Sequence, residues 1–254
     1  MSLISLQRIL FRVFNKIETW EALERAFGPI TWKNYRYECY DRLLSGLLES
    51  KQRIYSAAYI MPSRSGALRS PRKHRNHLRM IEMMMAKSLP ARLAAAPSAK
   101  SAFLMLRSFP MIGDFLGYQF LTDLNYGPLL NFSEMEFVVA GPGALSGIRK
   151  CFSETAGLAP ADIIRLVAES QQEQFAKRGI EFPSLYGRAL QLIDCQNLFC
   201  EIDKYARVAH PEFNAKSGRT RIKQVYRRNA EPLRVWFPPK WHINDAVPES
   251  VLAT

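Results

Sequence analysis

The most informative motif of the sequence is LRSFPMIGDFLGYQFLTDL, residues 106–124. A helix ends near Leu106, a tight Pro-x-Ile-Gly turn follows, and a second helix begins at Asp114 or a neighbouring residue. The second helix carries a small residue among apolar ones: Gly117 stands between Phe115, Leu116, Phe120 and Leu121. The pattern therefore predicts two helices joined by a hairpin.

A hairpin of this kind has a specific use on DNA. The hairpin glycine, Gly113, leaves backbone N–H groups at a helix N-terminus, where they can bind one DNA phosphate without reading sequence. We therefore assign DNA contacts to Ile112, Gly113 and Asp114 in a helix-hairpin-helix module over about residues 104–124. Taken alone, the pattern fits an ordinary packing corner between two helices equally well.

Helical periodicity extends over most of the chain and predicts a mainly all-α fold with little or no sheet. Residues 51–61 fit either a helix or a strand, and 62–72 form a polar, basic loop. No repeat or linker divides the chain, so we expect a single domain, 1–254, with an extended C-terminal tail at about 230–254. We expect helices at 3–27, at 35–48 with Thr31 as N-cap, at 74–89 ended by Pro90, and at 100–107, 161–177 and 185–206.

Composition excludes several classes of protein. The 254 residues are 48% hydrophobic and 23% charged, which excludes a disordered chain, a collagen-like fibre and a coiled coil. No run of about 18 or more apolar residues occurs, so no membrane-spanning helix is expected. Arg8 and Arg12 interrupt the apolar N-terminus, which argues against a signal peptide. The four cysteines have no paired spacing. We therefore expect a cytoplasmic protein, in the host cytoplasm if the source is viral, with reduced, buried thiols.

The net charge is +12, and its distribution is uneven. Residues 62–107 contain ten Lys or Arg and one acid, and residues 204–240 contain ten Lys or Arg and two acids. Such an excess favours a polyanionic partner, usually nucleic acid and less often an anionic membrane surface. We assign Arg64, Arg69 and Arg72 to DNA binding; two solvated basic loops are the alternative.

A glycine-rich turn lies in EFVVAGPGALSGIRKCF, residues 136–152. Gly141 and Gly143 precede a helix, and a turn of this kind is a good cradle for an anion. A structural loop explains it equally well. The phosphate-binding pattern G-x-x-x-x-G-K-[ST] does not occur in the sequence, which disfavours a nucleotide kinase.

Carboxylates recur at helical spacing in QLIDCQNLFCEIDKYARV, residues 191–208. Asp194, Asn197, Glu201 and Lys204 form one polar stripe, and Asp203 lies off it. Carboxylates stacked in this way can ligate a metal or act as a base, whereas a solvated face is the more common explanation. The opposite face carries the apolar Leu192, Cys195, Phe199 and Ile202.

Seven motifs occur in a specific order over about residues 8–241: ILFRVFNKIETWEAL, IYSAAYIMPS, KHRNH, FPMIGDFLGYQFLTDLNY, EFVVAGPGA, DCQNLFCEIDKY and VWFPPKW. Together they resemble the helical, glycosylase-like domain found with 5-hydroxymethyluracil DNA kinases and in bacteriophage thymine hypermodification enzymes. The latter are the α-glutamyl/putrescinyl thymine pyrophosphorylases, or amino acid:DNA transferases. The resemblance implies a helix-hairpin-helix DNA glycosylase-like fold.

The resemblance implies a reaction on double-stranded DNA. A transferase of this family displaces pyrophosphate from 5-(pyrophosphoryloxymethyl)uracil with an amine or amino acid, after the base has left the stack. A carboxylate takes the proton of the amine, and cations or a divalent metal such as Mg²⁺ neutralise the pyrophosphate. The catalytic candidates are Asp194, Glu201, Asp203 and Glu136. The pyrophosphate-binding candidates are Lys73, His74, Lys204, Gly141 and Gly143, and no metal-ligand set is assigned.

Two other functions stay open. The hairpin also resembles that of the helix-hairpin-helix DNA glycosylases, and the position of their catalytic Asp corresponds to SEMEF, which contains Glu134 and Glu136. A glycosylase would release a free base, with Glu136 in place of the usual Asp. The third possibility is a non-catalytic DNA-binding subunit of a hydroxymethyluracil DNA kinase. His74 and His77, three residues apart, fit phosphate contacts, metal ligands or plain surface residues.

Overall fold

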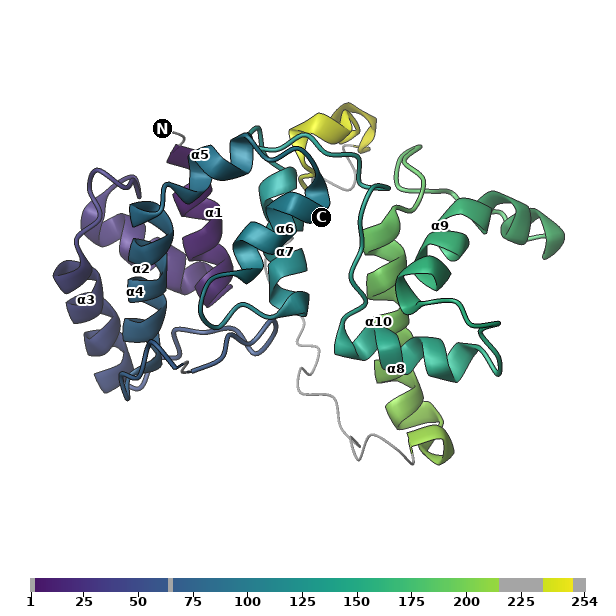
Figure 1. The fold of residues 1–254 in the computed structure, drawn as a ribbon, viewed down its shortest axis with the longest axis horizontal. Helices are drawn as coiled ribbons and strands as arrows, with labels where there is room; N and C mark the ends of the chain where they lie inside the picture. The colour runs from purple at the N-terminus through teal and green to yellow at the C-terminus, as the bar shows by residue number, and fades with distance from the viewer. Residues whose placement is uncertain (1–2, 64–65, 215–234, 249–254) are drawn as a thin grey trace. The chain divides into compact units, whose positions relative to one another are not determined.

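The computed structural model describes residues 3–63, 66–214 and 235–248 (Figure 1). Over these residues it contains ten α-helices and three short 3-10 helices, and its only β-pairing is an isolated bridge between Leu185 and Arg188. The expected mainly all-α fold is confirmed. The chain forms two compact units, 1–132 and 133–254. That both belong to one domain stays a prediction.

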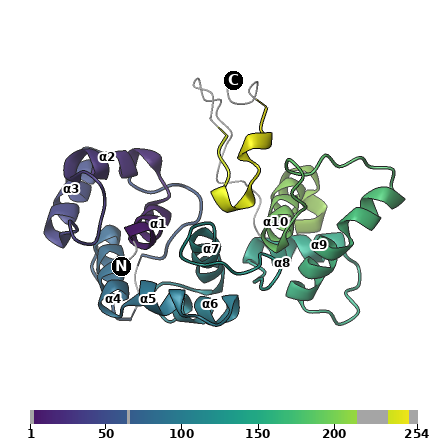
Figure 2. The same cartoon turned by 90° about the horizontal axis from the view of Figure 1, so that it is seen from above.

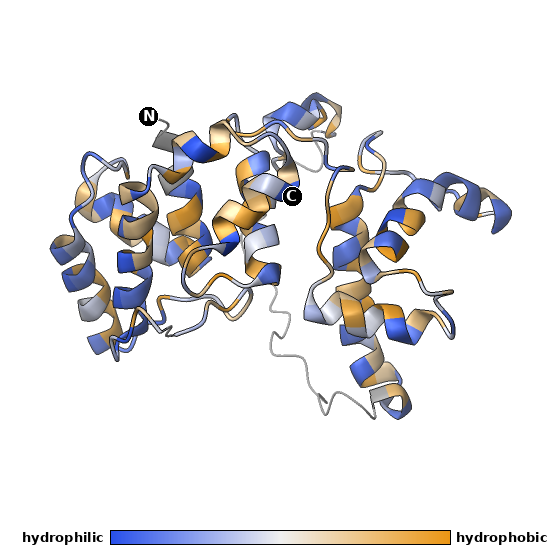
Figure 3. Cartoon of the chain, viewed as in Figure 1, coloured by the Kyte–Doolittle hydropathy of each residue, from blue (hydrophilic) through white to orange (hydrophobic). Residues whose placement is uncertain are grey.

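In its described residues, the first unit contains seven helices, with α1 in the middle and the others around it (Figure 2). The core-facing side of α1 carries Ile9, Leu10 and Val13, which are buried, as the helical spacing of apolar residues predicts. Apolar sides of the helices turn toward their neighbours (Figure 3). The helices are α1 Leu3–Phe14, α2 Ile17–Phe27, α3 Tyr37–Glu49, α4 Lys73–Ala86, α5 Leu89–Ala94, α6 Ala99–Arg107 and α7 Asp114–Asn125.

Four expectations for the first unit are wrong in detail. The helix expected at 3–27 is broken at Asn15, whose φ of +49° lies outside the helical region. Thr31 does not cap α3, which begins at Tyr37; its hydroxyl instead accepts the N–H of Asn34 in a preceding turn. Pro90 does not end α4, because it lies in the first turn of α5, where a missing N–H costs nothing. Residues 51–61 are neither helix nor strand.

The second unit is built on α8 Pro142–Cys151, α9 Pro160–Lys177 and α10 Leu192–Ala209. The helix expected at 185–206 begins later, at Leu192, because Gln191 and Asp194 form a capping box that satisfies the backbone there. Three short 3-10 helices follow: η1 Pro211–Asn214, η2 Pro239–Trp241 and η3 Asn244–Ala246.

The expected C-terminal tail is described only in part. Residues 235–248 form η2, η3 and their connections, and Ile243 and Val247 are buried. Residues 230–234 and 249–254 lie outside the described part of the chain. Within the described ranges, none of the helices has the length and apolar content needed to span a bilayer. The four cysteines are free thiols; Cys195 is buried, as we expected for all four, but Cys151 is exposed.

Candidate functional site

The hairpin between α6 and α7 has the geometry that its sequence predicts. Phe109 and Ile112 are buried beneath the turn, and Met111 takes the left-handed conformation with φ +67°. Gly113 is the N-cap of α7 and is exposed, and a Cβ atom built on it would meet nothing within 4 Å. The first N–H groups of a helix have no partner inside the helix. This end of α7 is therefore open to an anion.

An ion pair and a close helix contact stabilise the hairpin. Arg107, at the end of α6, forms an ion pair with Asp114, so the one acid of the turn is neutralised. Gly117 faces α6 so closely that an added Cβ would lie 3.1 Å from the Phe103 ring. The small residue thus lets the two helices approach and holds the turn between them.

The loop before α4 is anchored by two side chains of that helix. The Nε2 atom of His77 lies 2.8 Å from the Pro62 carbonyl oxygen, and its Nδ1 atom lies 2.7 Å from the Tyr55 hydroxyl. Because a carbonyl can only accept, Nε2 carries the proton and Nδ1 accepts from the tyrosine. Asn76 bonds the carbonyl oxygens of Ser63 and Ser70 at 2.7 and 2.9 Å.

His77 is therefore a buried structural residue. Burial lowers the pKa of His77 to about 4, against the weaker opposing effect of the Pro62 carbonyl. A neutral imidazole is what the two hydrogen bonds require. Of the three sequence-based interpretations, surface exposure is wrong for both histidines, since His74 is also fully buried.

His74 belongs to a second polar cluster between α3 and α4. Its Nε2 atom lies 2.8 Å from Asp41 and 3.2 Å from the Ser45 hydroxyl, and Arg75 binds the same Asp41 oxygen at 2.8 Å. Burial lowers the pKa of His74. Lys73 lies over the Tyr55 ring at 4.3 Å, and burial lowers the pKa of Lys73. Pyrophosphate binding by Lys73 and His74 stays a prediction.

The predicted DNA-binding arginines fall on this loop. Arg69 is exposed and donates to the Gly66 carbonyl at 3.0 Å, and Arg72 pairs with Glu49 at 3.0 Å in a partly exposed position. Arg64 lies outside the described residues.

In the second unit, the glycine-rich turn serves helix packing. The N–H of Gly141 donates to Gln196 at 3.2 Å. A Cβ on Gly143 would lie 3.0 Å from the Cys200 sulfur, and one on Gly147 would lie only 2.0 Å from the Phe199 carbonyl oxygen. These glycines thus let α8 lie against α10. Anion binding at Gly141 and Gly143 stays a prediction.

Asp203 is the most buried of the predicted catalytic carboxylates, with 1% of its surface exposed. The Ser146 hydroxyl and the Lys150 ammonium donate to it at 2.6 and 2.8 Å, and Arg207 pairs with its other oxygen. Burial opposes ionisation, but these hydrogen bonds outweigh it and hold the pKa of Asp203 below its ordinary value. The carboxylate joins α8 to α10.

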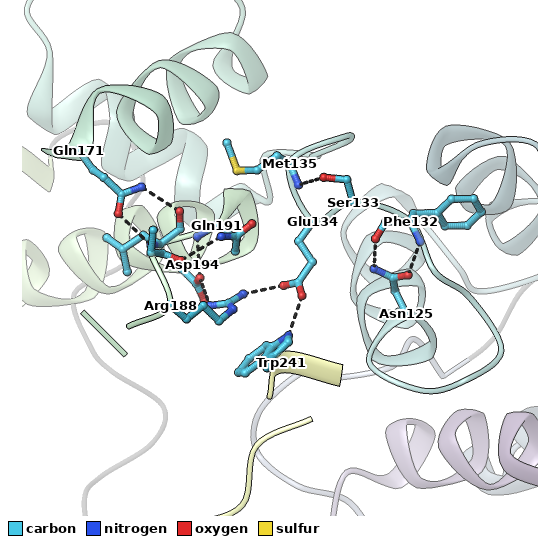
Figure 4. Close-up of polar contacts among 12 residues, drawn as sticks. Asn125, Phe132, Ser133, Glu134, Met135, Gln171, Arg188, Gln191, Asp194 and Trp241 are labelled. Atoms are coloured by element: carbon cyan, nitrogen blue, oxygen red, sulfur yellow. Dashed lines mark hydrogen bonds and ion pairs between the residues drawn. The ribbon is translucent and has the colours of Figure 1, made fainter. Parts of the chain in front are cut away.

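Asp194 lies in a network around Arg188 (Figure 4). Arg188 binds Asp194 at 2.8 Å and Glu134 at 2.6 Å. The indole N–H of Trp241 donates to the second Glu134 oxygen at 2.6 Å, and the guanidinium of Arg188 lies 3.9 Å from the centre of the Trp241 ring. Asp194 also accepts the N–H of Gln191 at 2.8 Å in the capping box.

The other two predicted carboxylates are exposed. Glu201 pairs with Lys204 at 2.5 Å on the outer face of α10, as the polar stripe predicts. The Glu136 side chain is exposed, and its backbone carbonyl accepts from Arg165 at 3.0 Å. The four carboxylates thus have four different surroundings. The described residues contain no group of three or more His, Cys, Asp or Glu suited to hold a metal ion.

Sequence reasoning did not single out Arg188 or Trp241. Each is far from Glu134 in the sequence, so no spacing rule connects them. The motif VWFPPKW, which contains Trp241, was the only signal.

Comparison with known proteins gives one result. The model of the 5-hmdU DNA kinase helical domain matches residues 4–215. No curated protein and no solved structure matches the chain. The match covers most of the chain, including the hairpin, the glycine-rich turn and α10. The chain therefore belongs to the family of the 5-hmdU DNA kinase helical domain.

Proposed function

We propose that this chain binds double-stranded DNA through the α6–α7 hairpin and modifies bases derived from 5-hydroxymethyluracil. The observation that best supports this proposal is the open N-terminus of α7. There Gly113 is exposed, and the neighbouring Asp114 is neutralised by its ion pair with Arg107. Backbone N–H groups at such a helix end can bind a DNA phosphate whatever the base sequence. The family match supports a DNA substrate carrying 5-hydroxymethyluracil, and the net charge of +12 supports a polyanion.

For the reaction, we propose amine transfer to 5-(pyrophosphoryloxymethyl)uracil. The nitrogen of an amine or amino acid bonds to the exocyclic methylene carbon as the bond from that carbon to oxygen breaks. Pyrophosphate leaves with the electron pair of the broken bond. The nitrogen loses a proton, which a carboxylate accepts, and cations stabilise the departing charge.

The Glu201–Lys204 pair suits both needs. The two side chains lie on one outer face of α10, 2.5 Å apart and open to solvent. An arriving pyrophosphate competes for the lysine, which releases the carboxylate to take the proton. Asp203 and Asp194 are less suited to this role, because strong hydrogen bonds hold both in structural positions.

A second candidate is a DNA-binding subunit without catalytic activity that serves a hydroxymethyluracil DNA kinase. The description of the family as a helical domain of a DNA kinase favours it, and the chain itself contains no phosphate-binding loop motif. Both candidates share the hairpin and DNA binding, so the reaction separates them.

DNA binding is tested with two substitutions at the hairpin. Gly113→Ala fits the open space and keeps the free amides, so we expect affinity close to that of the wild type. Gly113→Asp places a negative charge at a helix N-cap, which favours the helix but repels a phosphate. We expect about tenfold weaker binding by fluorescence anisotropy with a labelled duplex. Equal affinity of the two variants would contradict binding at the hairpin.

The basic loop is tested by the salt dependence of binding. The double variant Arg69→Gln, Arg72→Gln should lower the slope of log K against log salt by about 0.9 for each phosphate that the protein no longer neutralises. Arg25→Gln, at the exposed end of α2, is the control and should leave the slope unchanged. An unchanged slope in the double variant would mean that this loop does not contact phosphates.

The reaction is tested by incubating DNA that carries 5-(pyrophosphoryloxymethyl)uracil with a panel of amines and amino acids, followed by nucleoside mass spectrometry. Transfer yields an aminated nucleoside, glycosylase activity yields a lost base, and the non-catalytic role yields no change. If transfer occurs, Glu201→Gln should lower turnover by about 100- to 10,000-fold while DNA binding persists. Glu136→Gln should have a smaller effect; the reverse ranking would assign the reaction to the glycosylase-like position.

A further inference from the structure

We propose that Ile60 is the side chain that enters the DNA base stack at the site where the hairpin binds. This inference rests on the proposed DNA binding and identifies the residue that holds the duplex open. Four observations support it. Tyr59 has a strained backbone conformation, its ring stacks on Phe115 of α7, Ile60 is exposed, and the residues on both sides of Ile60 are held by contacts.

The strained residue is Tyr59, whose φ is +50°. A bulky aromatic residue rarely adopts this left-handed conformation, which persists only where the surrounding contacts enforce it. A tight turn built from glycine would avoid the strain. The conformation at Tyr59 therefore indicates that the direction of the chain at this point is enforced by contacts of the tyrosine ring.

Those contacts come from α1 and α7. The Tyr59 ring stacks on Phe115 with centroids 6.0 Å apart and planes 3° apart. The guanidinium of Arg12 lies 4.5 Å from the centre of the same ring. Arg12 is itself held by both oxygens of Asp123 on α7. Helix α7 thus positions the Tyr59 ring twice, directly through Phe115 and indirectly through Asp123, which holds Arg12.

The stack of Tyr59 on Phe115 places the loop beside the open N-terminus of α7. Phe115 is the second residue of that helix and lies in its first turn, two residues after Gly113. The loop containing Tyr59 passes this end of the helix (Figure 1). A phosphate bound at the hairpin would therefore have this loop as its neighbour.

Ile60 is exposed between two fixed residues. Its side chain is 52% exposed, whereas the next residue, Met61, is 1% exposed in the core. Beyond it, the Pro62 carbonyl accepts from His77. Tyr59 is stacked on one side of Ile60 and Met61 is buried on the other, and the Ile60 side chain between them faces solvent.

An outward apolar side chain on a loop anchored at Tyr59, Met61 and Pro62, beside the proposed DNA-binding hairpin, fits one partner, the gap left in a stacked duplex. Enzymes that act on a base must take it out of the stack, and apolar side chains inserted between base steps hold such gaps open. The exposed Arg69 farther along the same loop supplies charge that suits flanking phosphates. The apolar surface of Ile60 would be removed from water only in the complex.

The experiment uses a duplex with one 5-hydroxymethyluracil and a neighbouring 2-aminopurine, whose fluorescence rises when it unstacks. We expect the full chain to raise the fluorescence on binding. Ile60→Ala should bind within about threefold of the wild type, because phosphate contacts dominate affinity, but should reduce the rise by about tenfold. Ile60→Leu should restore it. The matched control is Ile17→Ala, a similarly exposed isoleucine, at 59%, on α2.

The outcomes separate this inference from the proposed function. If the wild type binds and Ile60→Ala keeps the full rise, or if binding produces no rise, the role of Ile60 is refuted while DNA binding stands. If neither the wild type nor Gly113→Ala binds DNA, the proposed function fails, and this inference with it. Loss of the rise in Ile17→Ala as well would also refute a specific role for Ile60.

Discussion

Gly147→Ala should destabilise the second unit, although alanine is the better helix former. In the structure, a Cβ at this position would lie 2.0 Å from the Phe199 carbonyl oxygen and 2.7 Å from its carbonyl carbon, where ordinary contacts begin at 3.4 Å. The obstacle is backbone of α10, so no side-chain rotation relieves it. The two helices must separate, and the packing between them weakens.

The magnitude follows from two opposing effects. Forcing a methyl group into a well-packed contact costs about 1–3 kcal/mol, and the upper end applies because backbone must move. Replacing glycine by alanine inside a helix returns about 1 kcal/mol. The net loss in the free energy of unfolding is therefore about 2 kcal/mol, or about 1 M in the urea midpoint.

The matched control is Gly46→Ala on α3, where an added Cβ meets nothing within 4 Å. This variant gains helix propensity without a clash, so its free energy of unfolding should rise by about 0.5–1 kcal/mol. Urea unfolding followed by circular dichroism measures both. If Gly147→Ala were as stable as the wild type, α8 and α10 would not pack as closely as described, and the glycine would be better explained by a ligand.

Two further predictions concern buried polar groups. The pKa of His77 is about 4 in the folded chain, below its value of about 6.5 when unfolded. Its contribution to stability is therefore complete above pH 6.5 and falls as the pH drops toward 4, by up to about 3 kcal/mol. Urea midpoints across this range should show that decline, and a His77→Gln variant with an equally steep decline would assign it to other groups. Lys150→Met removes one partner of buried Asp203 and should lower stability by about 2 kcal/mol at neutral pH; a neutral effect would mean that Arg207 and Ser146 suffice.

The hairpin shows how far local sequence reaches. The two helices and the tight turn between them follow from residues close together in the chain, and the structure has them as predicted. The side chain of Ile112, which we assigned to DNA contact, is buried instead. Helix boundaries were less predictable. The break at Asn15 depends on a single residue adopting a left-handed conformation that no periodicity reveals.

On α10, the spacing of residues predicts the burial of the apolar side chains but not that of Asp203. Leu192, Cys195 and Phe199 are buried, as their spacing requires, and the Glu201–Lys204 pair is exposed. Asp203 lies off that polar stripe, and nothing in the helix itself indicates that it is buried and paired. Its burial depends on Lys150 and Ser146 of α8, about fifty positions earlier, which reach it only after the two helices have packed.

The helices, their apolar faces and the hairpin are predictable from the amino-acid sequence, because they depend on contacts a few residues apart that repeat with the helical period. Which polar groups are buried, and which loop lies beside the hairpin, depends on packing between distant segments. The Tyr59–Phe115 stack and the Glu134–Arg188–Trp241 network each join distant segments. A buried charge or a strained loop is stable only when such a distant partner compensates it, and no local pattern specifies that partner.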